Sequence, residues 1–488
     1  MFTTETGEGR PLTQVGAPHS NEEHALALTA LRGLREEFAV DPNIGSAAEL
    51  VSAAVMLREH EIAEDAAEFL LMHAENTTPT ALTGARKVLG VDRIHLESAQ
   101  PAAKLNLQTL QSQVRELRAR VRVFPYNALV HLDLARLFTA LGSNEKAERH
   151  LHIAIGLAPR HRLTVRAVVR FLIHLGQPER ALRLLRSLDG VRHDPWLMAT
   201  EISTASVAGR PQQLVRQART MLDRHQHSAL DTSELAASLA TLEVVDGNAK
   251  KARQMMHRAL EGPTENTVAQ ARWVGRRVKL DLVGVEQLDV PRNFEARAWA
   301  AYASMNFEES QGLFAEWLRD EPFSSRPALL ASYLADMLNP SSEQAIEMAL
   351  IGVQADGHDV MLRNNLAFYL GSAGRLKDAK IHLAVATARV ESGEEAAVKA
   401  TQGLIAFREG DPVQGERLYR DAIQVALMQK NEIVAATAQL YLAREATVAG
   451  LEHAEVLVRE AFKAAESSRD PDLVLVVNRV QRDLQRLR

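Results

Sequence analysis

A set of small and apolar residues returns along this chain at a constant interval. The interval is 34 residues from Gly142 to Gly176 and again from Ala147 to Ala181. The best-defined unit carries Leu134, Ala135, Phe138, Gly142, Ala147, Ala154 and Pro159. A fixed period of this length, with apolar residues at helical spacing between the small ones, is typical of helical hairpins stacked in tandem. We therefore predict an all-α chain, a solenoid in which neighbouring hairpins replace a central core.

Length and composition agree with an array of repeats. A chain of 488 residues is too long for one ordinary core, and 46% hydrophobic with 24% charged residues is the composition of a folded protein. The chain has no cysteine, which excludes disulfides, thiol nucleophiles and Cys-ligated zinc. The first residues form no secretory signal, and no apolar run approaches the ~18 residues that span a bilayer. We expect a cytoplasmic protein without membrane contact.

Changes in pattern along the chain predict its domains. We expect a disordered N-terminal tail at 1–20, N-terminal helices with a degenerate hairpin and a heptad-like helix at 21–122, a first array at 123–262, an irregular joint at 263–293, and a second array with a C-terminal capping helix at 294–488. The heptad-like helix carries Leu107, Leu110, Val114, Leu117 and Val121. This pattern favours a helix packed on the first good repeat, with a dimer seam as the alternative. The oligomeric state is not predicted.

The turns of the hairpins have their own signature. A turn glycine is followed five residues later by a small or apolar residue in Gly142/Ala147, Gly176/Ala181, Gly209/Leu214 and Gly247/Ala252. A small residue is expected where the two helices cross, because a larger one would force the backbones apart. Three turns read Gly-x-Pro, ending in Pro178, Pro211 and Pro412. Glycine ends one helix in the left-handed conformation, and proline is tolerated in the first turn of the next.

These hairpins resemble the tetratricopeptide repeat (TPR), a two-helix unit of 34 residues. Ala128 to His161 matches the strongest positions of the pattern, and much of Val360 to Glu391 matches through Leu366-Ala367, Gly374, Ala379 and Ala386. The stretch with Gln402-Gly403, Gly410 and Ala422 matches more loosely, and Met305, Ser310 and Pro340 depart from the pattern. The resemblance implies an interaction scaffold that grips a peptide or partner helix on its concave face.

No catalytic or metal-binding motif is present in the sequence. It has no Gly-Lys dipeptide for a phosphate-binding loop, no His-Glu-x-x-His and no Gly-x-Ser-x-Gly, and no two of its 17 histidines lie three or four residues apart. Asp470 and Asp472 precede the last predicted helix, where helix capping is a better interpretation than a metal site. We expect a non-enzymatic protein without cofactor or metal.

One basic row stands out as a candidate binding surface. Arg162, Arg166 and Arg170 lie four residues apart, and His174 continues the row. The register of the repeats places Arg136 of the preceding hairpin beside them. Few acidic residues are nearby in sequence, so the row is expected to remain unneutralised and to bind an anionic guest such as an acidic peptide. The alternative is a solvated helix face.

A second candidate lies in the later repeats. Asn364 and Asn365 precede Leu366-Ala367, and TPR domains that clamp a terminal carboxylate use such an asparagine together with basic residues of neighbouring hairpins. The following hairpin offers Lys399 and Thr401, so the clamp is incomplete. By this resemblance Asn365 is a candidate to grip a peptide backbone; the alternative is a packing or solvated role.

Charge favours two functional hypotheses, and an enzyme whose site is assembled from unfamiliar residues is a third. Residues 101–230 contain 20 basic and 9 acidic residues, a net charge of +11, whereas the remainder has 37 basic and 53 acidic residues, a net charge of −16. The leading hypothesis is an adaptor that binds an acidic protein or peptide. The alternative is a nucleic-acid-associated regulator that uses the basic segment, although aromatic residues for base stacking do not interleave the arginine row.

Overall fold

The computed structural model describes residues 21–57, 59–74, 77, 79–90, 105–159, 161–224, 227–279, 283–284, 290, 292–340, 343–391, 393–466 and 468–487. All regular secondary structure in these residues is helical, which confirms the all-α prediction. Contacts divide the chain into unit 1 (Met1–Ala103, Ser112–Thr139, Ser143–Asn293) and unit 2 (Lys104–Gln111, Ala140–Gly142, Phe294–Arg488). The predicted disordered tail at 1–20 lies outside the described residues.

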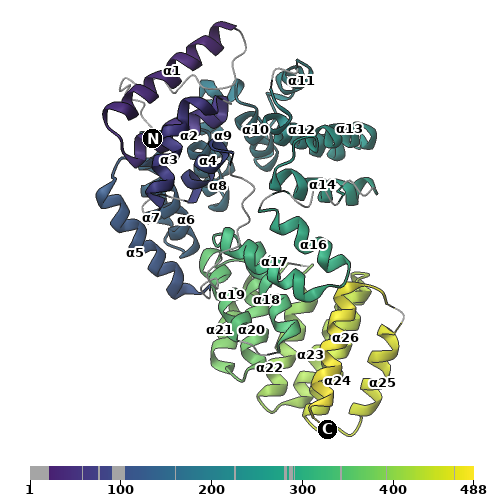
Figure 1. The fold of residues 1–488 in the computed structure, drawn as a ribbon. Helices are drawn as coiled ribbons and strands as arrows, with labels where there is room; N and C mark the ends of the chain where they lie inside the picture. The colour runs from purple at the N-terminus through teal and green to yellow at the C-terminus, as the bar shows by residue number, and fades with distance from the viewer. Residues whose placement is uncertain are drawn as a thin grey trace. The chain divides into compact units, whose positions relative to one another are not determined.

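The helices that precede Asn293 begin with an N-terminal group and continue as successive hairpins (Figure 1). In chain order they are α1 (Asn21–Val40), α2 (Ile44–Leu57), the 3-10 helix η2 (His60–Ala63), α3 (Glu64–Met72), α4 (Pro79–Val88), α5 (Leu107–Val123), α6 (Ala128–Ala140), α7 (Asn144–Leu157), α8 (Arg162–His174), α9 (Pro178–Arg186), the 3-10 helix η4 (Asp189–Arg192), α10 (Pro195–Val207), α11 (Val215–Asp223), α12 (Ala229–Val245), α13 (Ala249–Ala259) and α14 (Glu265–Val278).

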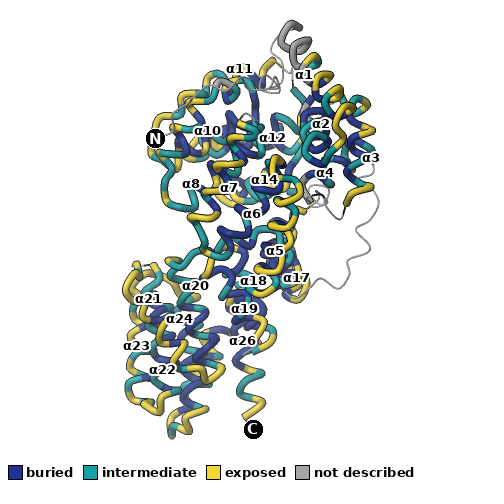
Figure 2. Tube along the Cα trace, turned by 90° about the vertical axis from the view of Figure 1, so that its left-hand side faces the viewer, coloured by how far each residue is buried: buried dark blue, intermediate teal, exposed yellow. Residues whose placement is uncertain are grey.

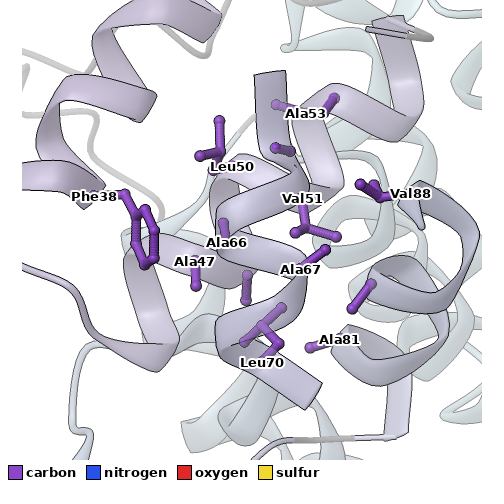
Figure 3. Close-up of a cluster of buried hydrophobic side chains, with 14 of the residues drawn as sticks. Phe38, Ala47, Leu50, Val51, Ala53, Ala66, Ala67, Leu70, Ala81 and Val88 are labelled. Atoms are coloured by element: carbon purple, nitrogen blue, oxygen red, sulfur yellow. The ribbon is translucent and has the colours of Figure 1, made fainter. Parts of the chain in front are cut away.

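The N-terminal helices α1 to α4 close around small side chains (Figure 3). Ala47, Ala66 and Leu70 have no exposed surface, and the rings of Phe38 and Phe69 meet edge to face with centroids 5.5 Å apart. Alanines at these positions let the helix backbones approach closely. The N-terminal helices, which the sequence predicted to include a degenerate hairpin, therefore form a packed group of four α-helices.

The glycine turns form as the sequence predicted. Gly142, Gly176, Gly209 and Gly247 all have positive φ, and Ala147, Ala181 and Ala252 are fully buried in the second helices that follow. Pro178 and Pro412 occupy the first turns of α9 and α23 (Pro412–Met428).

One hairpin departs from the predicted turn chemistry. We expected Pro211 to open a helix and Leu214 to lie at the crossing, but α11 begins only at Val215 and the fully buried residue is Ala218. The spacing rule failed here because the loop after Gly209 is longer than in the other hairpins.

The segment expected to be irregular at 263–293 contains a helix. Thr264 caps α14 by accepting a hydrogen bond from the backbone N–H of Thr267, and Val268, Ala271 and Val274 are fully buried along it. The Gly-Pro pair at 262 and 263 had suggested a long loop, but it ends one hairpin and the threonine starts the next helix. The expectation of irregular structure was therefore wrong for Glu265–Val278.

The heptad-like helix α5 is packed within the chain. Leu110, Val114 and Leu117 are all buried. A seam that is already covered is not available for a dimer, so this observation favours the packed-helix interpretation over the alternative.

Unit 2 continues the same architecture (Figure 1). Its helices after Asn293 are α16 (Phe294–Ala303), α17 (Phe307–Asp320), α18 (Ser325–Leu338), α19 (Glu343–Ala355), α20 (Val360–Ser372), α21 (Leu376–Arg389), α22 (Glu395–Arg408), α23 (Pro412–Met428), α24 (Glu432–Val448), α25 (Ala454–Ala465) and α26 (Pro471–Gln485). Each first helix from α18 to α24 contacts the next first helix, and α24 contacts α26. Buried residues recur along each unit instead of gathering at one centre, as Figure 2 shows.

The turn at Met305 keeps the geometry of a glycine turn without glycine. Met305 has φ +59°, and the N–H of Asn306 donates to the carbonyl of Ala301 at 2.9 Å. Arg375 and Leu370 form the equivalent bond at 2.8 Å across Gly374. The left-handed conformation costs a residue with a side chain about 1–2 kcal/mol, whereas glycine adopts it freely but loses more chain entropy on folding.

We expect Met305→Gly to raise the free energy of unfolding by about 0.5–1 kcal/mol, because the relief of strain exceeds the added entropy cost. Thermal unfolding followed by circular dichroism measures the change. The reciprocal variant Gly374→Met should lower the melting temperature. Equal melting temperatures for Met305→Gly and the wild type would contradict the strain argument.

Candidate functional site

The predicted arginine row lies on α8, the first helix of its hairpin. Arg162 begins the helix and His174 ends it. The spacing of four residues places Arg162, Arg166 and Arg170 along one side of the helix. Arg162 and Arg166 are partly buried, Arg170 is exposed and His174 is half-buried.

Arg162 and Arg166 meet at one aromatic ring, that of Trp196 on α10. Their guanidinium carbons lie 4.8 and 5.0 Å from the centre of the ring. Cations at this distance from an indole are attracted by its π-electrons. Trp196 is thus a member of the site that the sequence analysis missed.

Acidic residues of later hairpins neutralise these two arginines. Arg162 lies 3.4 Å from the carboxylate of Asp194, the N-cap residue of α10, and 4.0 Å from Asp231 on α12. Arg166 pairs with Glu234 on α12 at 2.6 Å. The expectation that the row stays unneutralised for lack of nearby acids was therefore wrong for Arg162 and Arg166. The acids are distant in sequence, but the stacking of first helices brings them to the row.

Glu234 connects the arginine row to the start of α14. Its carboxylate accepts hydrogen bonds from the Thr264 hydroxyl at 3.4 Å and from the Asn266 amide at 3.3 Å. Burial raises the pKa of the neighbouring Glu265, and the negative charge of Glu234 adds to that rise. The site is therefore a cluster of mixed charge on α8, the start of α10 and α12, which we call the first-helix cluster: Arg162, Arg166, Asp194, Trp196, Asp231 and Glu234.

The predicted position of Arg136 beside the row stays a prediction. Arg136 is half-buried on α6, and its charge acts on Asp133 of the same helix. Burial raises the pKa of that carboxyl, while Arg136, Arg120 and Arg292 lower it.

His161, just before the row, joins α8 to the N-terminal helices. Its Nε2 shares a hydrogen bond with the hydroxyl of Ser52 on α2, and its Nδ1 is buried without a partner. Burial lowers the pKa of His161 to about 4, and the adjacent Arg162 lowers it in the same direction. This contact was not predictable from the sequence because Ser52 lies on α2, outside the regular repeats.

Most residues of the second candidate site are buried or already paired. Asn364 is buried on α20 with its side-chain oxygen unpartnered, so it is not placed to touch a guest directly. Thr401 is buried and donates to the carbonyl of Ala397, and Lys399 lies 3.7 Å from Glu395. Half-buried Asn365 is the member of this site that remains a candidate.

Among the described residues, no cluster of three or more histidine or acidic side chains is arranged to hold a metal ion. Within the same part of the chain, no helix combines the length and apolar character needed to cross a bilayer. Asp470 caps α26 by accepting from the N–H of Asp472, as the sequence predicted.

No protein-family model and no curated protein matches this sequence. Similar solved structures include the yeast Tom70 crystal structure, with 12% identity and a TM-score of 0.29 over 95% of this chain and 96% of that chain. They also include the APC/C hetero-tetramer Cut9-Hcn1, with 11% identity and a TM-score of 0.36 over 97% and 98%. Likeness this weak carries no argument about function. The resemblance to the tetratricopeptide repeat rests on the tandem hairpins, their left-handed turn glycines and their buried alanines.

Proposed function

We propose that the chain is an interaction scaffold that binds a protein partner along the first helices of unit 1. In support of this, α8 contacts α10, α10 contacts α12 and α12 contacts α14, so these helices form a continuous row. A row of parallel helices suits an extended or helical polypeptide better than a compact small molecule.

The observation that carries the proposal is the first-helix cluster. Tryptophan and arginine are the residue types most enriched where protein interfaces gain their binding energy. Here Arg162 and Arg166 are held against Trp196 by acids, so their side chains are ordered before any partner arrives. Ordering of the free protein lowers the entropy cost of binding.

We propose further that the partner presents acidic side chains to this row. Arg170 is the exposed arginine of the row and offers the first contact. Arg166, with 21% of its side chain exposed, can share its guanidinium between Glu234 and a carboxylate of the partner.

Several arginines of the basic segment at 101–230 form ion pairs with acidic residues of the same chain, which disfavours the nucleic-acid hypothesis. Arg180 pairs with Glu148, Arg186 with Glu201, and Arg219 with Glu243. Paired arginines contribute less to the release of counterions that drives binding to phosphate backbones. A protein is therefore the better partner for this surface.

The test is a charge reversal with a matched control in the same hairpin. Arg170→Glu alters the first helix α8, and Arg183→Glu makes the same change at an exposed arginine of the second helix α9. Affinity capture with quantitative mass spectrometry should show proteins that the wild type and Arg183→Glu retain and that Arg170→Glu loses about tenfold or more. Circular dichroism controls for folding.

Equal capture of partner proteins by Arg170→Glu and Arg183→Glu would show that the arginine row of α8 does not bind the partner. Salt-dependent binding of RNA or DNA that Arg170→Glu abolishes would favour the nucleic-acid hypothesis instead.

A further inference from the structure

The last helix of unit 2, α26, carries three charged residues on one face. Asp472, Arg479 and Asp483 are separated by seven and four residues, which places them on the same side of a helix. Arg479 is only 1% exposed, although an arginine of a terminal helix is ordinarily in solvent. This face is therefore turned into the protein.

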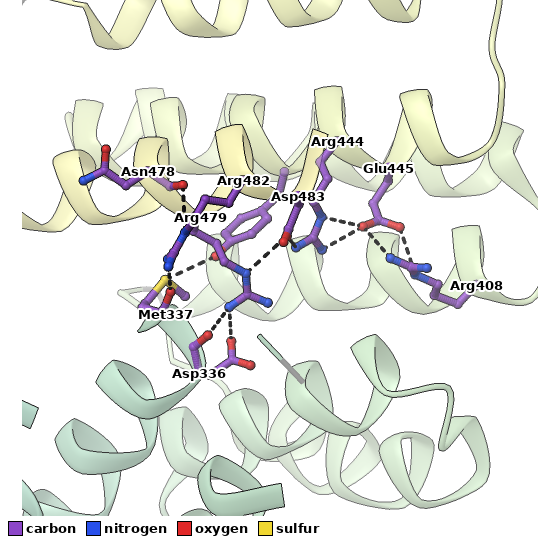
Figure 4. A network of polar contacts seen from close by, with 10 residues as sticks. Asp336, Met337, Arg408, Arg444, Glu445, Asn478, Arg479, Arg482 and Asp483 are labelled. Atoms are coloured by element: carbon purple, nitrogen blue, oxygen red, sulfur yellow. Dashed lines mark hydrogen bonds and ion pairs between the residues drawn. The ribbon is translucent and has the colours of Figure 1, made fainter. Parts of the chain in front are cut away.

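The face of α26 contacts α18, a helix far away in the sequence (Figure 4), and it also bonds to one residue of α16. Arg479 donates from Nη1 to the carboxylate of Asp336 on α18 at 2.7 Å. Arg482 donates to the carbonyls of Met337 and Leu338 at 2.6 and 3.0 Å, at the C-terminal end of α18. The hydroxyl of Tyr302 on α16 donates to Asp472.

A second set of contacts joins α26 to α24. In this respect α26 occupies the place of the next first helix in the array. Asp483 lies 3.2 Å from Arg444, and Arg444 pairs with Glu445, which also receives Arg408 of α22 (Figure 4). Apolar residues of α26 are buried as well; they are Leu473, Leu475, Val476 and Val480.

The contacts with α16 and α18 differ from those of an ordinary repeat array. In such an array each hairpin touches its neighbours in sequence, but three hairpins separate α18 from α26. We propose that the inner face of α16 and α18 is a helix-binding surface, and that α26 is the ligand this chain supplies for it. An alternative ligand would be an amphipathic helix with an inward arginine, an acid seven residues before it and an acid four residues after it.

The chemistry of these contacts suits release. The hydrogen bonds and the ion pair that join α26 to α16 and α18 are polar, so water can replace them once the helix moves away. A buried ion pair adds little net stability, because solvation of the separated charges offsets its attraction, but a ligand that lacks one of the two charges leaves the other buried without a counterion. Selectivity without a large gain in stability is what an exchangeable helix requires.

The experiment uses the full chain with a protease site inserted between α25 and α26. After folding, cleavage leaves α26 bound without a covalent link. A labelled peptide of residues 470–488 is then added, and fluorescence anisotropy follows its binding. The comparison peptides carry Arg479→Ala or, as a matched control at an exposed arginine, Arg486→Ala.

We expect the wild-type and Arg486→Ala peptides to replace the cleaved helix, and the Arg479→Ala peptide to bind about tenfold or more weakly. Circular dichroism should show that the cleaved chain stays folded while α26 exchanges. Unfolding of unit 2 upon loss of α26, absence of exchange, or equal binding of the Arg479→Ala peptide would each overturn the proposal. The site is separate from the first-helix cluster, so neither result depends on the partner of unit 1.

Discussion

Replacement of Asp336 by alanine should lower the free energy of unfolding of unit 2 by about 3–5 kcal/mol. Asp336 has no exposed side-chain surface, and its partner Arg479 is 1% exposed. Without the carboxylate, the guanidinium keeps Asp483 at 3.2 Å and the backbone carbonyl of residue 336 as acceptors. A buried cation that loses its fully buried carboxylate partner and keeps only a more exposed one cannot recover the solvation that it gave up on folding.

The double variant Asp336→Ala, Arg479→Met separates this penalty from the net contribution of the pair. Removal of both charges should restore at least half of the lost stability, because an apolar side chain can fill the site without solvation cost. Urea unfolding with pulse-labelling hydrogen exchange, measured on peptides of α18 and α26, gives the stability of this unit. A loss below about 1 kcal/mol in the single variant would mean that water reaches Arg479.

The parts of the fold that local chemistry determines were predictable from the sequence. Gly142 and Gly176 must adopt a conformation that few other residues tolerate, and Ala147 and Ala181 must fit where helices cross. Both requirements are visible without any knowledge of distant contacts. The prediction weakened where loop length varied, as at Pro211, and where a cap residue such as Thr264 had to be recognised beside a Gly-Pro pair.

The neutralisation of the arginine row was missed because acids were sought nearby in sequence. Arg166 and Glu234 are 68 residues apart, twice the period of the repeat, and Arg180 and Glu148 are 32 apart. In stacked hairpins, equivalent positions one or two periods apart are neighbours in space. A search at those intervals would have found the acids from the sequence alone.

No comparable repeat interval in the sequence predicts the contacts of α26. Arg479 and Asp336 are 143 residues apart, and their meeting depends on the accumulated curvature of the intervening hairpins. Small rotations between successive repeats set that curvature, and side-chain packing at every interface contributes to it. A pattern within one repeat cannot specify such a sum.

Acidification should destabilise unit 1 through His161. The pKa of His161 is about 4 in the folded chain, against 6.5 for an exposed histidine. Between these values the unfolded chain binds a proton that the folded chain does not, so the free energy of unfolding falls as the pH falls from about 6.5 to about 4. Above pH 6.5 and below pH 4, the titration of His161 does not change the free energy of unfolding.

Protonation is opposed by the surroundings of His161. Nδ1 is buried without an acceptor, Nε2 is engaged with Ser52, and Arg162 is adjacent; Asp194 alone favours the charged form. The full difference corresponds to about 3 kcal/mol, of which about 2 kcal/mol is lost by pH 5.

The histidine pair His131 and His150 also makes the free energy of unfolding fall as the pH falls. His131 and His150 share a hydrogen bond between their Nδ1 atoms at 2.9 Å, and His131 Nε2 donates to the carbonyl of Pro125 at 3.0 Å. Neutral rings satisfy this arrangement, whereas two protonated rings would place N–H against N–H. Burial lowers the pKa of both residues, that of His150 to about 4.

Replacement of His161 by glutamine measures the contribution of His161 to the pH dependence of the free energy of unfolding. Glutamine keeps a hydrogen-bonding group near Ser52 but does not titrate, so the variant should lose about 2 kcal/mol less stability than the wild type between pH 7.5 and pH 5. Urea unfolding at each pH, followed by pulse labelling at a common pH, measures this on peptides of α2 and α8. His257→Gln, at an exposed position on α13, is the comparison variant. If His161→Gln and His257→Gln lose equal stability on acidification, the buried ring of His161 does not control the acid sensitivity of unit 1.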